Sequence, residues 1–213
     1  MLFLSASFNI KQANHLRGER NLDRKLNKKE KASIRGELLN LLKESFVYSN
    51  DAVFTLSSGR KSHFYIDSKK VTLDPSGGFL VGQLILDAIH DLEVDAIGGM
   101  TLGADPMVIS ASVLSYGDGP PLPAFLIRKD SKGFGENPFI EGNLKKNSNV
   151  IIVDDVLTSG SSLERTVKMI EDLGCKVIRI VALVDRKEGG RERLEAKGHD
   201  IVTLFTVEDL LKA

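Results

Sequence analysis

This 213-residue sequence has little cysteine, no tryptophan and no net charge. It has one cysteine, Cys175, no tryptophan, and 29 Lys and Arg residues against 29 Asp and Glu. A single cysteine can form neither an intramolecular disulfide nor a zinc site by itself, so we expect a protein of a reducing compartment, the cytoplasm. The zero net charge and the aromatic share of 6% argue against nucleic acid or an anionic membrane as the main partner.

Long apolar runs and common nucleotide-binding loops are also missing. No stretch approaches the roughly 18 apolar residues of a membrane span. The apolar opening of the sequence lacks the basic region and cleavage site of a signal peptide. Neither a Gly-Lys-Ser/Thr phosphate loop nor a G-x-G-x-x-G fingerprint occurs. The hydrophobic share of 42% nevertheless suffices for a folded core.

The first thirty or so residues differ in composition from the rest. Lys and Arg outnumber Asp and Glu there, and the segment has little apolar periodicity. We expect residues 1–32 to be a basic, poorly ordered extension or an overcalled start; the alternative is a basic arm for a polyanion or partner. The globular pattern begins near Ser33, so residues 33–213 are expected to form one domain.

After Ser33 the sequence indicates a helix, a hairpin of strands 53–56 and 64–67, and then strict alternation of helices and strands. Buried apolar strands that alternate with amphipathic helices form a parallel sheet covered on both faces, so we predict an α/β fold. Ligands of such sheets bind at the carboxyl ends of the strands. Further strands are expected at 96–97, 124–127, 150–153, 177–184 and 201–205, and helices at 77–91, 104–114, 162–173, 188–197 and 207–211, with a long loop at 128–149.

The strongest functional signal is the run VIIVDDVLTSGSS at 150–162. A buried strand delivers Asp154 and Asp155 to its carboxyl end, where adjacent carboxylates are costly unless they meet hydroxyls, a cation or a metal. The turn after them has only small side chains, so backbone N–H groups and a helix N-terminus can surround an anion. We therefore expect a phosphate and a sugar diol to bind side by side; an ordinary helix N-cap is the alternative.

Three further segments could complete such a site. The loop RKDSKGFGEN at 128–137 is cationic and contains glycine, which suits a mobile lid over a polyanion. The segment FTLSSGRKSHFYID at 54–67 reads as a hairpin. Arg186 follows a strand and could pair bidentately with a carboxylate. Taken alone, each segment could also be an ordinary surface feature.

Together these motifs resemble the orotate phosphoribosyltransferases, a family of type I phosphoribosyltransferases. The run 150–162 resembles the phosphoribosyl pyrophosphate (PRPP) motif of the superfamily. The Arg-Lys-x-x-Lys loop at 128–132, the Leu-x-Ser-Gly-Arg-Lys-Ser segment at 56–62 and the Asp-Arg pair at 185–186 narrow the resemblance to orotate. It extends from about Ser33 to the C-terminus. It implies the type I phosphoribosyltransferase fold, a mainly parallel central sheet flanked by helices, with a small N-terminal hood and a flexible lid loop.

The resemblance also implies an activity, namely transfer of the 5-phosphoribosyl group from PRPP to orotate. Mg²⁺ would be held mainly by PRPP and water near Asp154 and Asp155, and a homodimer would place each lid loop in the neighbouring active site. The implied catalytic residues are Lys132, Arg128, Asp154 and Asp155. The implied PRPP-binding residues are Arg128, Lys129, Lys132, Asp154, Asp155, Val156, Leu157, Thr158, Ser159, Gly160, Ser161 and Ser162. The implied orotate-binding residues are Thr158, Arg186, Tyr65 and Ile66.

Two positions depart from the family pattern. Phe134 stands where the family usually has His, and Ser57 where it often has Lys, so each removes one donor to the pyrophosphate. Three alternative functions have to be weighed against transfer to orotate. A purine or uracil phosphoribosyltransferase would not need Arg186, and a PRPP-sensing RNA-binding regulator is disfavoured by the zero net charge. A bifunctional enzyme that also decarboxylates the product would need a second barrel, for which there is no room.

Overall fold

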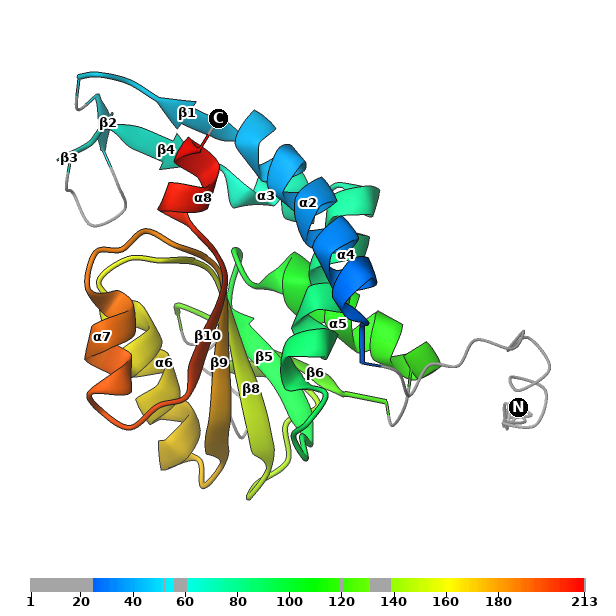
Figure 1. Ribbon diagram of the computed structural model, residues 1–213. Coiled ribbons are helices and arrows are strands. Elements are labelled where there is room, and N and C mark those ends of the chain that lie inside the picture. The colour runs from blue at the N-terminus through cyan, green and yellow to red at the C-terminus, as the bar shows by residue number, and fades with distance from the viewer. Residues whose placement is uncertain (1–24, 52, 56–60, 119–120, 131–138, 213) are drawn as a thin grey trace, which may run out of the picture.

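The computed structural model describes residues 25–51, 53–55, 61–118, 121–130 and 139–212. A six-stranded sheet forms the centre of the molecule (Figure 1). Its strands are parallel except for the last pair, in which β7 runs antiparallel to β6. This confirms the expected α/β fold. In spatial order the strands are β10 (Ile201–Thr206), β9 (Lys176–Asp185), β8 (Asn149–Leu157), β5 (Ala96–Met100), β6 (Ala124–Ile127) and β7 (Ile140–Gly142).

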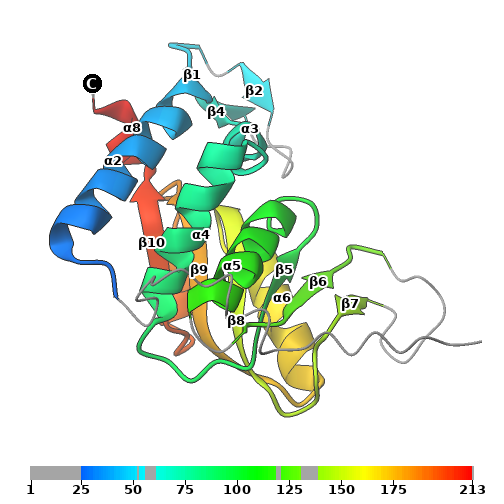
Figure 2. The same cartoon turned by 90° about the vertical axis from the view of Figure 1, so that its right-hand side faces the viewer.

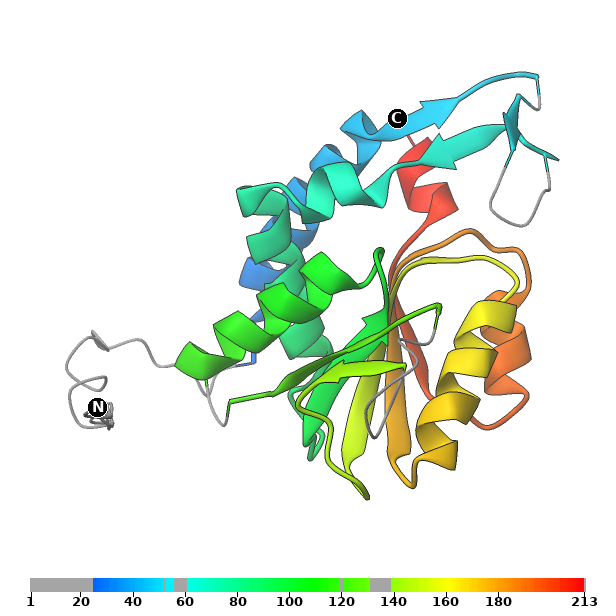
Figure 3. The same ribbon diagram turned by 180° about the vertical axis from the view of Figure 1, so that it is seen from behind.

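Helices cover both faces of the sheet (Figures 1, 2 and 3). On one face lie α4 (Pro75–Ile89) and α5 (Asp105–Asp118), with α2 (Lys28–Glu44) against α4; on the other lie α6 (Ser161–Asp172) and α7 (Gly190–Glu195). Successive side chains of a strand point to opposite faces, so an unbroken apolar strand supplies two cores. In β8, Ile151 and Val153 enter one core cluster, while Val150 and Ile152 enter the other.

A small hood of short strands lies beyond the carboxyl ends of the parallel strands (Figure 1). The expected hairpin of 53–56 with 64–67 is wrong, because each of these segments pairs with a different strand. Strands of two or three residues are too short for an alternating pattern to specify their partner. The pairs are β1 (Phe46–Tyr48) with β4 (Phe64–Ile66) and β2 (Phe54–Thr55) with β3 (Lys61–Ser62), followed by α3 (Ser68–Thr72); α8 (Val207–Leu211) ends the chain nearby.

Two elements of the sheet differ from the sequence-based prediction. The loop expected over 128–149 contains β7, a strand of three residues that leaves no recognisable period in the sequence. Strand β8 continues beyond Val153 through both acids to Leu157. It does so because the neighbouring strand β9 keeps pairing with it, from Asp154 opposite Ala182 to Leu157 opposite Asp185. The acids therefore sit on a paired, rigid backbone.

The first described helix, α2, begins at Lys28, whereas apolar periodicity placed the start of the globular part near Ser33. Asn27 and Glu30 form a capping box, in which each side chain accepts a hydrogen bond from the backbone of the other. A capping box extends a helix without apolar residues, which explains the earlier start. Residues 1–24 of the expected extension lie outside the described residues, so the domain boundary stays a prediction.

None of the described helices combines the length and the apolarity needed to cross a bilayer.

Candidate active site

The acidic pair of β8 lies at the carboxyl end of the sheet, and the hood is bonded to it. Ser68, the first residue of α3, donates its hydroxyl proton to Asp155 Oδ2 at 2.6 Å. The backbone N–H of Val156 donates to Asp155 Oδ1 at 3.0 Å. These two hydrogen bonds, one to each oxygen, hold the Asp155 carboxyl group in one orientation. Ser68 is fully buried, which shields this contact from water.

Asp154 has the opposite environment. Asp154 as a whole is partly exposed, but its carboxyl group is densely surrounded by protein atoms. This desolvation, with the adjacent Asp155 charge as the second cause, raises the pKa of Asp154 from 3.8 to about 8. The charged form of Asp154 is therefore disfavoured near neutral pH. Sugar hydroxyls or a cation would relieve this cost by supplying donors or positive charge.

A glycine-containing loop between β5 and α5 lies directly against the pair. A Cβ atom at Gly103 would lie 2.4 Å from Asp155 Oδ1, and one at Gly99 would lie 2.3 Å from the carbonyl oxygen of Val153. Only glycine allows such a close approach at these two positions. Asp105 begins α5, and desolvation raises its pKa as well. The loop between β5 and α5 is thus adjacent to the predicted ribose site.

The small-residue turn after β8 joins the strand to α6. Gly160 has a φ of +73° and occupies the N-cap position of α6 without a side-chain cap, so the first N–H groups of the helix have no side-chain acceptor there. The hydroxyls of Ser159 and Ser161 lie 3.2 Å apart beside them. Backbone donors, two hydroxyls and the helix dipole therefore converge, as an anion site requires.

The glycine turn at 189–190 supports the small-residue turn before α6. A Cβ atom at Gly190 would lie 2.2 Å from the carbonyl oxygen of Thr158 and 2.7 Å from the backbone nitrogen of Gly160. The turn at the start of α7 therefore packs directly on the turn before α6. The Arg186 N–H also donates to the carbonyl oxygen of Leu157 at 2.9 Å. The structure thus brings Arg186 and residues 154–162 together, as the sequence predicted.

The Arg186 side chain is buried between the sheet and the hood. Its Nε donates to Glu188 Oε1 at 2.8 Å, and its Nη2 donates to Ser62 Oγ at 2.8 Å. The guanidinium carbon lies 4.1 Å from the centre of the Phe64 ring. Only 3% of this side chain is exposed. A buried cation in such fixed surroundings can recognise a carboxylate that enters the site.

The two residues predicted to line the base pocket have different environments. Tyr65 is 41% exposed, and its ring stacks on that of Phe54 with centroids 6.0 Å apart. Ile66 is only 7% exposed and belongs to the core. Adjacent strand residues point to opposite faces. Tyr65 can therefore offer a side chain to a ligand, whereas Ile66 offers mainly its backbone.

The lid is described only at its two ends. Arg128 follows β6, its backbone N–H donates to the carbonyl oxygen of Phe139 at 2.8 Å, and its Nη1 lies 3.3 Å from Glu141 Oε1. Lys129 is exposed. The predicted site residue Lys132 and the two departures from the family pattern, Phe134 and Ser57, lie outside the described residues.

A cavity of about 320 Å³ lies elsewhere, between α2, α4 and β10. Two of its cations form ion pairs: Lys31 Nζ lies 2.5 Å from Asp87 Oδ2, and Arg179 Nη1 lies 3.2 Å from Asp91 Oδ1. The first pair joins α2 to α4, and the second joins β9 to the segment that follows α4. The cavity is remote from the carboxyl ends of the strands, where the acidic pair lies.

Four residues at the site were given no individual role from the sequence, namely Ser62, Ser68, Glu188 and Gly190. Ser62 and Ser68 bond to partners 124 and 87 residues away, and no local pattern reveals these contacts. A signal existed for Ser62, which ends the segment at 56–62 that carries the resemblance, and for Gly190, because the Gly-Gly pair at 189–190 follows a strand end just as the turn after β8 does.

Comparison with known proteins identifies first the class and then the family. A model of the phosphoribosyl transferase domain matches residues 101–208, about half of the chain. The chain is 40% identical over 178 residues to the orotate phosphoribosyltransferase of Aquifex aeolicus, covering 83% of this chain and 97% of that one. It is 41% identical over 180 residues to that of Thermosynechococcus vestitus, covering 84% and 94%.

A solved structure agrees with these relatives. Orotate phosphoribosyltransferase of Mycobacterium tuberculosis in complex with PRPP superimposes with a TM-score of 0.69 at 32% identity, covering 83% of this chain and 98% of that one. The chain belongs to the orotate phosphoribosyltransferase family.

The raised pKa of Asp154 predicts a cost in stability that depends on pH. Between about pH 4 and pH 8 the folded protein keeps a proton that the unfolded chain releases, so the free energy of unfolding falls as pH rises through this window. Asn cannot ionise. We expect Asp154→Asn to be more stable than wild type by more than about 2 kcal/mol at pH 8.5, but little different near pH 4, in urea denaturation. The exposed Asp51→Asn serves as control. A constant difference at all pH values would contradict the raised pKa.

Proposed function

We propose that this chain transfers the 5-phosphoribosyl group from PRPP to orotate, giving orotidine 5′-phosphate and pyrophosphate in pyrimidine (UMP) biosynthesis. The observation that carries the proposal is the meeting of three features at one sheet edge. These are the acidic pair of β8, the uncapped turn before α6 and the buried Arg186. The named activity of the relatives supports the same reaction. The single, buried cysteine accords with an enzyme of the cytoplasm.

PRPP would lie along β8 and the turn that follows it. Backbone N–H groups of 158–162 and the hydroxyls of Ser159 and Ser161 would bind the 5-phosphate. Asp154 and Asp155 would accept hydrogen bonds from the ribose hydroxyls. As the bond between C1 and the pyrophosphate oxygen breaks, positive charge develops on the ring, as in other glycosyl transfers. The two carboxylates would then stabilise that charge from below the ring.

Orotate would lie between the hood and Arg186. Its carboxylate would pair with the guanidinium, its ring would approach Tyr65, and Thr158 would contact it from the phosphate turn. Orotate arrives as an anion, so its N1 can attack C1 without a strong protein base. The role of the protein is therefore to hold N1 opposite the leaving pyrophosphate. This orientation lowers the activation barrier of the reaction.

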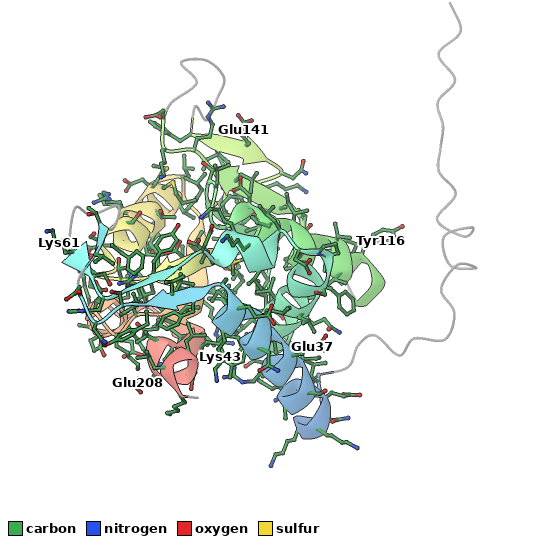
Figure 4. All side chains as sticks on the ribbon, turned by 90° about the horizontal axis from the view of Figure 1, so that it is seen from above. Glu37, Lys43, Lys61, Tyr116, Glu141 and Glu208 are labelled. Carbon is green, nitrogen blue, oxygen red and sulfur yellow. The ribbon has the colours of Figure 1, made fainter. Side chains whose placement is uncertain are left out.

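The leaving pyrophosphate would be neutralised by the cationic loop. Arg128, Lys129 and Lys132 supply this charge. Arg128 pairs with Glu141, and both side chains are more than 40% exposed. Such exposed pairs contribute little stability, typically below about 1 kcal/mol, so Arg128 can exchange Glu141 for pyrophosphate at small cost. Figure 4 shows Glu141 at the rim of the molecule.

Mg²⁺ fits beside the acidic pair. Within the described part of the chain neither Asp154 nor Asp155 forms an ion pair, and burial, followed by the adjacent Asp155 charge, raises the pKa of Asp154. PRPP and water would hold most of the ion's coordination sites, with these two residues facing it. When bound, the ion supplies positive charge that neutralises the pyrophosphate.

We also propose that two copies of this chain pair through α5. Ile109, Val113 and Tyr116 follow one face of this helix at helical spacing, and each is half exposed or more. Phe79 on the neighbouring helix α4 is half exposed as well. Figure 4 places Tyr116 at the outer side of α5. Apolar side chains gathered on one face usually mark an interface, and a symmetric dimer would cover them and let each lid loop reach the other active site.

A direct assay tests the reaction. With PRPP and Mg²⁺, purified protein should release pyrophosphate when orotate is added. It should do so far more slowly, by about a hundredfold or more, with uracil, adenine or hypoxanthine, which lack a carboxylate for Arg186. Equal or faster release of pyrophosphate with a purine would show that the purine, and not orotate, is the substrate. No release with any base, together with salt-sensitive binding of RNA, would favour the regulator instead.

Removal of a lid cation should slow the chemical step. We expect Lys132→Ala to lower kcat at least about tenfold, because one donor to the leaving pyrophosphate is lost. The exposed Lys146→Ala, which removes the same charge outside the lid, should keep the wild-type kcat. Unchanged kcat in Lys132→Ala would remove this lysine from the mechanism.

Disruption of the α5 face should separate the subunits. Wild-type protein is expected to sediment as a dimer of the 23.3 kDa chain, and Val113→Asp as a monomer. The monomer should also lose most activity, because it lacks the partner's lid. Leu211→Asp charges a similarly exposed apolar residue on a different helix, α8, and should stay dimeric. A dimeric Val113→Asp would place the interface elsewhere.

A further inference from the structure

Ser62 fixes Arg186 to the backbone of the hood. It is the last residue of the Leu-x-Ser-Gly-Arg-Lys-Ser segment. Its hydroxyl accepts from Arg186 Nη2 at 2.8 Å, donates to the Phe64 carbonyl oxygen at 2.8 Å and accepts from the Phe64 N–H at 3.1 Å. Ser62 is 7% exposed, so water does not compete for these bonds. Three bonds therefore determine where this hydroxyl lies, and through it the guanidinium.

The contacts of Arg186 occupy one edge of its planar group. Nε and Nη2 form the side-on edge, and Glu188 and Ser62 bind these two nitrogens. The ring of Phe64 covers one face of the plane. Within the ranges that the structure describes, Nη1 has no hydrogen bond. The end-on edge, made of Nη1 and the second proton of Nη2, thus stays available for bidentate pairing with a carboxylate.

We propose that Ser62 is a positioning residue for recognition of the substrate carboxylate. Together with Glu188 it holds the side-on edge of Arg186, so that the end-on edge faces orotate. This inference rests on the proposed transfer to orotate. It assigns the selection of an anionic base to a hood residue that does not itself touch the substrate.

The physical benefit is preorganisation. A free arginine side chain loses much rotamer freedom when it is fixed by a ligand, and that loss weakens binding. Here the protein has fixed the guanidinium before orotate arrives. Loss of the Ser62 hydroxyl should therefore weaken the binding of orotate while the PRPP site, built on β8 and α6, keeps its contacts.

The test measures KM for each substrate and thermal stability. Ser62→Ala should raise KM for orotate about tenfold, since a hydrogen bond to a charged group is lost, and should leave KM for PRPP within about twofold. Ser62→Thr, which keeps the hydroxyl, should restore KM for orotate. Ser115→Ala removes another buried hydroxyl that bonds to backbone groups, at Ser112 and Leu122, and should change stability without changing either KM.

Two further comparisons separate the possible failures. In an Arg186→Ala background, Ser62→Ala should have no additional effect on KM for orotate, and a full additional effect would overturn the positioning role. If Arg186→Ala itself leaves KM for orotate unchanged, the proposed carboxylate site fails instead.

Glu188→Gln keeps the acceptor for Nε and should bind orotate as wild type does or more tightly, whereas Glu188→Ala should bind it more weakly. Equal effects of both Glu188 variants, or equal changes of both KM values in Ser62→Ala, would contradict the inference.

Discussion

The crowding of two adjacent carboxyl groups at the end of one paired strand is the constraint on which the rest of the site depends. Ser68 and the following N–H hold Asp155 in place, and burial, with the adjacent Asp155 charge as the second cause, raises the pKa of Asp154 to about 8. Because β8 stays paired with β9 as far as Leu157, the two acids cannot move apart to relieve their repulsion. The fold thus bears a local cost that a bound sugar and its cation would remove.

Among the described residues, one hydrogen bond joins Ser68 of α3 to Asp155 of β8, and another joins Ser62 of the hood to Arg186, which follows β9. In the proposed reaction the first contact would lie on the ribose side of the site and the second on the base side. The hood itself consists of strands of two or three residues, which would not be stable alone. Its position therefore depends on the residues that it helps to orient, and structure and function are supported by the same contacts.

Local patterns predicted much of this molecule from its sequence. Continuous apolar strands predicted the parallel sheet, and the run at 150–162 predicted the strand, turn and helix found there, because each is encoded within a few neighbouring residues. The binding of a phosphate by this run stays a prediction. The pairing of the hood strands was predicted wrongly, since segments this short carry no register. The contacts of Ser62 and Ser68 could not be predicted, because they join residues that only the tertiary fold brings together.

The contact between the two glycine turns has a consequence for how the substrates bind. The segment 186–190 begins at Arg186, which is proposed to bind the base, and ends at Gly190, which packs on the turn before α6 that is proposed to bind the phosphate. In the proposed reaction a single short piece of backbone would thus border both ligand sites. An adjustment of it that improves the fit of one substrate would shift the walls of the other site, so the two binding free energies would be coupled and each substrate would change the affinity for the other by the same factor.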